Sequence, residues 1–124
     1  MTVHDAELLE ICRRLVAYDT VGTASNVPCA EYLADLLDRA GRQVRLHRDH
    51  ALGTDKASVV AWAGPPVADG LILSGHMDVV PHAEQPGWTR DPLELGRDGE
   101  RIYGRGVADM KAFLAQCAVV ARGL

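Results

Sequence analysis

The stretch LILSGHMD, residues 71–78, decides how this chain should fold, because an apolar run leads directly into an imidazole and a carboxylate. Its first three residues are continuously apolar, a pattern typical of a strand that is covered on both faces. Open α/β sheets bind their ligands just beyond the carboxyl ends of such strands. We therefore expect a buried central strand at residues 71–74, with His76 and Asp78 directly after it.

Two amphipathic helices should precede this strand. From Ala6 to Tyr18, apolar residues recur at helical spacing and charged residues occupy the other face. A second helix should begin at Ser25 or Asn26, either of which can cap it, and end just before Gly41.

The rest of the chain adds strands and a last helix. The patterns predict an outer strand at 43–48, a buried strand at 58–63, two short strands around 93–95 and 101–103, and a helix at 109–120 that ends at Gly123. This order is typical of an α/β fold, a layered mixed sheet flanked by helices. The central strand would lack a neighbour on one side within this sequence, which leaves an apolar edge unpaired and predicts poor solubility.

Composition narrows the function classes. With 48% hydrophobic and 24% charged residues the chain is typical of a soluble globular protein, and a net charge of -4 without a basic stripe argues against nucleic acid as a partner. No apolar run approaches the roughly 20 residues that cross a bilayer. Cys12, Cys29 and Cys117 are widely spaced among apolar residues, which is typical of reduced thiols and of a cytoplasmic protein.

His76 and Asp78 form the first chemical element. Side chains alternate along a strand, so both would point the same way, and a carboxylate that receives one imidazole N–H leaves the other nitrogen available to a metal. An isolated H-x-D is more often an ordinary hydrogen-bonded histidine beside a turn. The pair alone therefore leaves both interpretations open.

The second element is YGRGVADMK, residues 103–111, where glycines permit a tight turn and Asp109 stands at the expected start of the last helix. An aspartate in this place can simply cap the helix, and it can also bind a metal. The G-x-G of Gly104 and Gly106 lacks the third glycine and the Lys-Ser/Thr of phosphate-binding loops, which argues against a nucleotide site.

Taken together, these segments resemble the acetylornithine deacetylase and succinyl-diaminopimelate desuccinylase family of two-zinc metallopeptidases, and the acetylornithine deacetylase branch in particular. The resemblance covers nearly the whole chain. It is carried by matching segments at residues 25–26, 55–58, 74–81, 87–92, 103–106 and 109–111. Met77, Ala108 and His82 depart from the family's usual residues.

The resemblance implies roles for three residues. His76 corresponds to a histidine ligand of the first metal, Asp78 to the catalytic-site aspartate that orients this histidine, and Asp109 to the carboxylate that bridges both metals. It also implies two Zn²⁺ ions per complete site, with Co²⁺ as an alternative. Such ions lower the pKa of a water and polarise the amide carbonyl that it attacks.

The implied reaction is hydrolysis of an N-acyl amino acid, most specifically N-acetylornithine in arginine biosynthesis. Desuccinylases, dipeptidases and carboxypeptidases are the alternatives within the class. The family's Glu-Glu pair, a later acid and a late histidine have no match in residues 1–124, so we expect this stretch to be the N-terminal portion of a catalytic domain and to be inactive alone. A homodimer would form through a region absent here. The alternative from another class is a non-catalytic module, or one half of a complementing pair.

Other residues receive structural interpretations. Trp88 is expected to anchor the loop around it or to line a substrate entrance, and Lys111 to be an ion-pair partner in the structure. His47, His50 and His82 lack the spacing of ligands and are expected at the surface.

Overall fold

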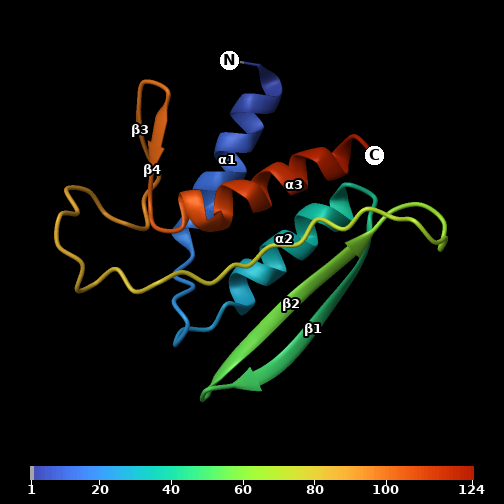
Figure 1. Cartoon of the computed structure of the whole chain (residues 1–124), viewed down its shortest axis with the longest axis horizontal. Helices are drawn as coiled ribbons and strands as arrows, with labels where there is room; N and C mark the ends of the chain where they lie inside the picture. Colours follow the sequence, from blue (N-terminus) through green and yellow to red (C-terminus); the bar gives the residue numbers. More distant parts are fainter. Residues whose placement is uncertain (1) are drawn as a thin grey trace.

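Three α-helices, four strands and one π-helical turn make up residues 2–124, the part that this computed structural model describes (Figure 1). The first helix, α1 (Val3–Ala17), begins three residues before the predicted start. Thr2 and Asp5 explain the difference, because each side chain hydrogen-bonds the backbone N–H of the other in a capping box. The buried face of α1 contains Ile11, Leu15 and Val16.

Helix α2 (Val27–Arg39) begins after Asn26, as predicted, but the Asn26 side chain does not cap it. Asn26 instead reaches strand β2. Its Oδ1 accepts the Ala57 N–H at 2.7 Å, and its Nδ2 donates to the Ala57 carbonyl at 3.0 Å. The start of α2 is thereby attached to the sheet.

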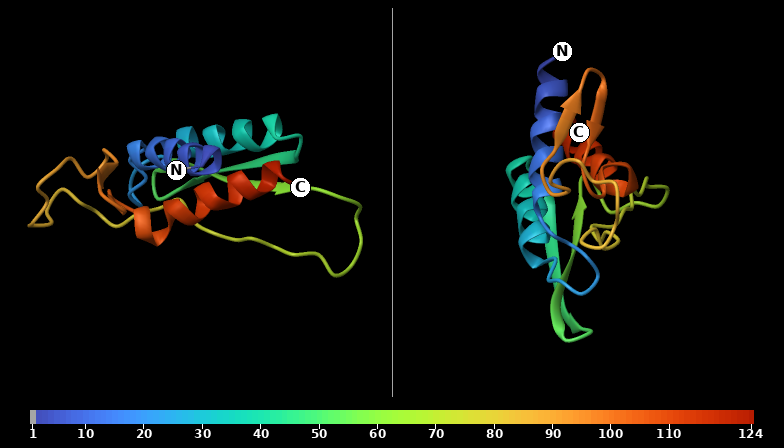
Figure 2. Two further views of the ribbon diagram at one scale, coloured as in Figure 1. Left: turned by 90° about the horizontal axis from the view of Figure 1, so that it is seen from above. Right: turned by 90° about the vertical axis from the view of Figure 1, so that its left-hand side faces the viewer.

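Strands β1 (Gln43–Ala51) and β2 (Thr54–Trp62) form an antiparallel hairpin in which Gln43 pairs with Trp62. Helix α2 packs on both strands, while α1 packs on α3 (Figure 2). The prediction that the second of these strands is covered on both faces is wrong. Residues alternate in exposure along β2, and Ala57 is its one buried residue, because a helix covers only one face.

A second hairpin pairs β3 (Gly96–Asp98) with β4 (Arg101–Tyr103). Strand β4 lies where it was predicted, but the strand expected at 93–95 begins at Gly96. An Asx turn takes its place, in which the Asp91 carboxylate accepts the Leu93 N–H at 2.8 Å. The mixed α/β class is confirmed, although two separate two-stranded sheets replace the single mixed sheet that was expected.

The buried central strand predicted at residues 71–74 is not formed. Leu71, Ile72 and Leu73 are 86%, 85% and 50% exposed, and no strand within residues 2–124 is paired with them. Residues 71–73 are thus an exposed apolar segment rather than the unpaired edge of a strand. A strand needs a hydrogen-bonding neighbour, and none of the described strands pairs with this segment.

Helix α3 (Ala112–Arg122) ends at Gly123 as predicted but starts three residues later than expected. The turn η1 (Val107–Lys111) precedes it, and Asp109 has an extended backbone there (φ -134, ψ 89). Asp109 therefore does not cap α3. Helices α1, α2 and α3 supply most of the hydrophobic core. None of the described helices is long and apolar enough to cross a membrane.

Candidate active site

Two segments far apart in the sequence meet at His76 and Asp109. The His76 Nε2 atom lies 3.0 Å from Asp109 Oδ1. On the other side of the ring, Nδ1 lies 3.0 Å from the Asp78 carbonyl oxygen and 3.2 Å from Asp78 Oδ1. All three residues that were predicted for the site are therefore brought together around one imidazole.

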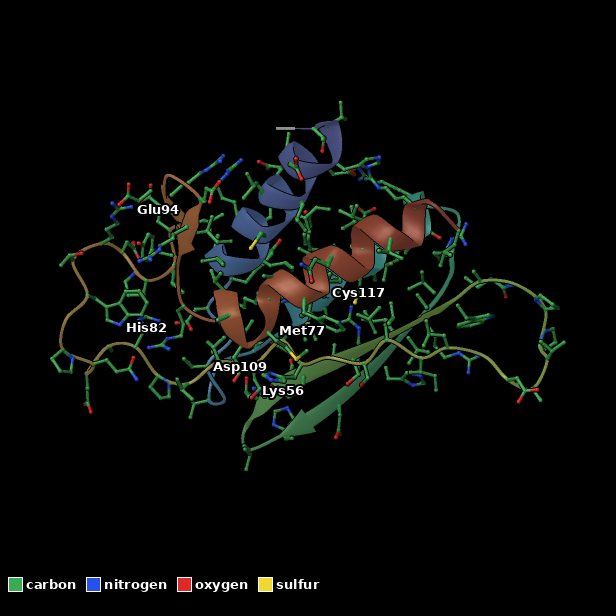
Figure 3. The ribbon with its side chains drawn as sticks, turned by 45° about the horizontal axis from the view of Figure 1, so that its top comes forward. Lys56, Met77, His82, Glu94, Asp109 and Cys117 are labelled. Atoms are coloured by element: carbon green, nitrogen blue, oxygen red, sulfur yellow. The ribbon has the colours of Figure 1, made fainter. Side chains whose placement is uncertain are left out.

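The site lies open to solvent at the η1 turn, which contains Asp109, labelled in Figure 3. The side chains of His76, Asp78 and Asp109 are 46%, 69% and 86% exposed. Exposed groups of this kind remain accessible to an ion or a substrate. They also interact through water, which weakens the attraction between their charges.

Oxygen atoms on both sides of the ring affect the protonation of His76. Desolvation by itself lowers the His76 pKa. The hydrogen bond to the Asp78 carbonyl, together with the charges of Asp78 and Asp109, outweighs that effect and raises the pKa above its ordinary value. Because both ring nitrogens face oxygen atoms, the arrangement suits an imidazolium that donates from each nitrogen.

Glycine and methionine allow the two segments to approach. A Cβ atom on Gly75 would lie 2.8 Å from Leu114 Cδ2, so a larger residue would push residues 75–78 away from α3. The His76 N–H also points to Met110 Sδ at 3.4 Å. Close packing at these positions keeps His76 beside the turn that presents Asp109.

The segment 18–21, between α1 and α2, holds both halves of the site, and sequence reasoning missed it. The Thr20 hydroxyl donates to the Met77 carbonyl at 2.5 Å, and the Val79 N–H donates to the Thr20 carbonyl at 3.1 Å. Lys111 Nζ donates to the Tyr18 carbonyl at 2.8 Å. The only signal in the sequence was a threonine in an apparent helix break, which is not specific.

Lys111 differs from its expected role as an ion-pair partner. It is fully buried, and its ammonium group donates to the Tyr18 carbonyl rather than to a carboxylate. Burial lowers its pKa.

Trp88 and the remaining histidines lie outside the group formed by His76, Asp78 and Asp109. The Arg105 guanidinium stacks on the Trp88 ring, 5.1 Å from its centroid, and both residues line an open hollow of about 670 Å³. This contact fits the anchoring role expected of Trp88. His47 and His50 are exposed as predicted, whereas His82 is more covered and lies 3.7 Å from Asp19.

The residues present suit part of a metal site. An imidazole nitrogen and a carboxylate oxygen converge at His76 and Asp109, and both are donor types that Zn²⁺ accepts. Within residues 2–124, no group of three or more His, Cys, Asp or Glu side chains is arranged to hold a metal ion. The described residues therefore bring together one imidazole and two carboxylates, those of Asp78 and Asp109.

Comparison with known proteins gives matches along this chain. Residues 72–124, which include His76 and Asp109, match the model of a family described as Peptidase family M20/M25/M40. A probable succinyl-diaminopimelate desuccinylase of Staphylococcus aureus (strain MRSA252) is 31% identical over 115 residues, which are 91% of this chain and 26% of that protein. The chain thus spans about a quarter of that relative's length.

The fold has a counterpart of known structure. The crystal structure of human carnosine dipeptidase 1 matches with a TM-score of 0.76 and 24% identity, over 98% of this chain and 29% of that one. The likeness shows that the fold is shared. Neither comparison distinguishes the acetylornithine deacetylase branch.

Proposed function

We propose that this chain is part of a metal-dependent hydrolase of the Peptidase M20 family, and that it forms the N-terminal portion of the catalytic domain. The observation that carries this proposal is the contact between His76 Nε2 and Asp109 Oδ1 at 3.0 Å, with Nδ1 held by Asp78. The family match of residues 72–124 covers all three residues. Peptidases of this family are generally metal-dependent, usually on zinc.

His76 is proposed as a metal ligand through Nε2. Asp78 holds Nδ1 through both its carbonyl and its carboxylate, which fixes the ring orientation and keeps the proton on Nδ1. Nε2 would then be the nitrogen that binds a cation, because a ligating imidazole must be neutral. Asp78 therefore acts as the residue that orients the ligand.

Asp109 is proposed as the second ligand and as a carboxylate shared by two ions. Its extended backbone in the η1 turn presents the side chain to solvent, where it is 86% exposed. One oxygen faces His76, and the exposed carboxylate can also contact a second ion. This placement supports the bridging role that the family resemblance implies.

A bound Zn²⁺ or Co²⁺ would supply the Lewis acid that polarises an amide carbonyl and the means to lower the pKa of a water molecule. His76 and Asp109 would hold such an ion, since both side chains are open to solvent. Asp78 keeps the imidazole in the binding tautomer. The general base and the remaining ligands would come from other residues of the whole protein.

The substrate class that we propose for the whole protein is an N-acyl amino acid. N-Acetylornithine is the first compound to test, because the motif segments resemble that branch most closely. The desuccinylase relative and the dipeptidase with the shared fold support N-succinyl amino acids and dipeptides as the alternatives. Protein purified from its native cells should release ornithine from N-acetylornithine, and release of product only from the succinylated compound would replace that assignment.

A cytoplasmic location is also proposed. Cys12, Cys29 and Cys117 are all free, and two of them are buried. Free buried thiols are usual in a reducing compartment.

The competing proposal is a non-catalytic module, favoured by the finding that no three ligand side chains group together within residues 2–124. Zn²⁺ binding separates the two proposals. A ligand that binds only the folded state raises its stability, by about 2.7 kcal/mol at a hundred times its Kd. The non-catalytic module predicts no such rise.

The experiment is thermal unfolding with and without Zn²⁺. We expect Zn²⁺ to raise the melting temperature of the wild-type chain, and His76→Ala or Asp109→Ala to remove the increase. His50→Ala is the matched control, because the His50 ring also pairs with an aspartate, Asp55, at 2.8 Å, whereas the neighbouring Asp49 carboxylate accepts the His50 backbone N–H. An increase that persists in His76→Ala would refute the proposed site.

A further inference from the structure

The segment between α1 and α2 touches both halves of the proposed metal site. Tyr18 is the C-cap residue of α1, and Thr20 and Val21 follow it. The two halves approach this segment from different parts of the chain: residues 76–79 come from a long irregular stretch, and residues 109–111 from the η1 turn. Their separation is therefore set partly by this common support.

Thr20 holds the half that contains His76. It is 1% exposed, and its hydroxyl donates to the Met77 carbonyl at 2.5 Å, while its own carbonyl accepts the Val79 N–H at 3.1 Å. Val21 and Val79 also form an isolated parallel bridge. Met77 lies between His76 and Asp78, so these bonds fix the backbone from which both site residues project.

Lys111 holds the half that contains Asp109. Its side chain is 0% exposed, its Nζ donates to the Tyr18 carbonyl at 2.8 Å, and its backbone N–H donates to Gly106 at 2.7 Å. Tyr18 lies at the C-terminus of α1, where carbonyl groups lack partners within the helix and favour a cation.

Burying a lysine in this space carries a desolvation cost. Removing an ammonium group from water costs free energy, and a hydrogen bond to one carbonyl offsets only part of that cost. An apolar side chain would fill the same space without losing hydration of a charge. The lysine does, however, supply a directed attachment. Its ammonium reaches from the turn carrying Asp109 to the residue two positions before Thr20.

We infer that Thr20 and Lys111 are positioning residues for the proposed metal site, which hold His76 and Asp109 at ligand distance by attaching both to the segment 18–21. The inference rests on the proposed function. Residues that orient metal ligands from behind typically change metal affinity by about 10- to 100-fold when they are replaced. The expected effect is thus on binding of the ion, beyond any effect on stability.

The test is the affinity of the full 124-residue chain for Zn²⁺ by calorimetry, with the absorption spectrum of the Co²⁺ form as a second readout. Thr20→Val keeps the shape and removes the hydroxyl, and Thr20→Ser restores it. We expect Thr20→Val to weaken Zn²⁺ binding by about tenfold or more and to change the Co²⁺ spectrum, and Thr20→Ser to recover most of both. Lys111→Met should act in the same direction.

Lys56→Met is the matched control. Lys56 Nζ also donates to backbone carbonyls, those of Gly22 at 2.8 Å and Ala24 at 2.5 Å, but it attaches β2 to residues just after the segment 18–21 and bonds neither half of the site. It should lower stability and leave the Zn²⁺ affinity of the folded chain unchanged.

Each outcome has a separate meaning. Far-UV circular dichroism selects the variants that remain folded, and Thr20→Val keeps the test informative even where Lys111→Met unfolds. Unchanged Zn²⁺ affinity and an unchanged Co²⁺ spectrum in folded Thr20→Val would overturn the inference. Wild-type affinity that is insensitive to His76→Ala would instead overturn the proposed function beneath it.

Discussion

Replacing Gly106 with alanine should destabilise the fold more than the same change at Gly41, although their backbones are nearly identical. Gly106 has a φ of 77° and Gly41 a φ of 76°, both in the left-handed region. The two positions differ in their surroundings. A Cβ atom on Gly106 would run into Val79 Cγ1, whereas a Cβ atom on Gly41 would meet nothing within 4 Å.

The expected loss of stability at each glycine follows from two contributions. A left-handed backbone costs a residue with a Cβ atom about 1–2 kcal/mol, and alanine recovers about 0.4–1 kcal/mol by restricting the unfolded chain. Gly41→Ala should therefore cost about 1 kcal/mol. At Gly106 the clash adds about 1–3 kcal/mol, because Val79 is buried and paired with Val21.

The assay is urea unfolding followed by circular dichroism, with Val79→Ala completing a double-mutant cycle. Val79→Ala should be costly in the wild-type chain, where it removes packing. It should cost less in Gly106→Ala, where it also removes the clash. Equal losses for Gly106→Ala and Gly41→Ala, or an equal cost of Val79→Ala in both backgrounds, would refute the reasoning.

Four further predictions concern the site, the thiols, the core and the exposed apolar segment. The raised pKa of His76 means that protonation of His76 stabilises the metal-free fold below its unfolded pKa, and that this contribution is lost as the pH rises through the folded pKa. Urea unfolding of wild type and His76→Ala across pH measures this contribution. Zn²⁺ binding should show the opposite pH dependence and weaken as the pH falls. Burial raises the pKa of Cys29 to about 11, so Ellman's reagent should modify the partly exposed Cys117 first and Cys29 only on unfolding. Leu15→Ala, at a fully buried position, should lower the free energy of unfolding by about 2–5 kcal/mol in urea titrations. Ile72→Lys should reduce aggregation in light scattering with little change in stability, since Ile72 is 85% exposed; unchanged scattering would show that this segment is not the aggregating surface.

Local sequence signals predicted most of the helices, and the resemblance to a known family indicated the residues of the candidate site. The helices predicted from apolar periodicity, α1 and α2, are present because each helix packs one apolar face against a common core. Asp109 lies far from His76 and Asp78 in the sequence, and the three residues lie together in the structure. Their roles as ligands and orienter stay predictions until metal binding is measured.

The predicted elements differ from the structure where a residue's hydrogen-bond partner lies far along the chain, or where a turn forms in place of a helix or strand. Asp91 closes an Asx turn, which moves the third strand to Gly96. Asn26 looks like a helix cap, yet its side chain binds Ala57 across the fold. Both side chains have several backbone partners of similar energy, and packing selects among them.

The sequence by itself determined the α/β class, the amphipathic helices and the residue types of the candidate site, because these depend on periodicity and on short motifs. Only the tertiary structure revealed that Thr20 and Lys111 attach both halves of that site to one segment, and that residues 71–74 lie exposed instead of forming a central strand. The physical reason is that a strand exists only with a hydrogen-bonded neighbour, and a buried lysine is stable only beside an acceptor. Such neighbours are distant in sequence and become adjacent only when the chain folds.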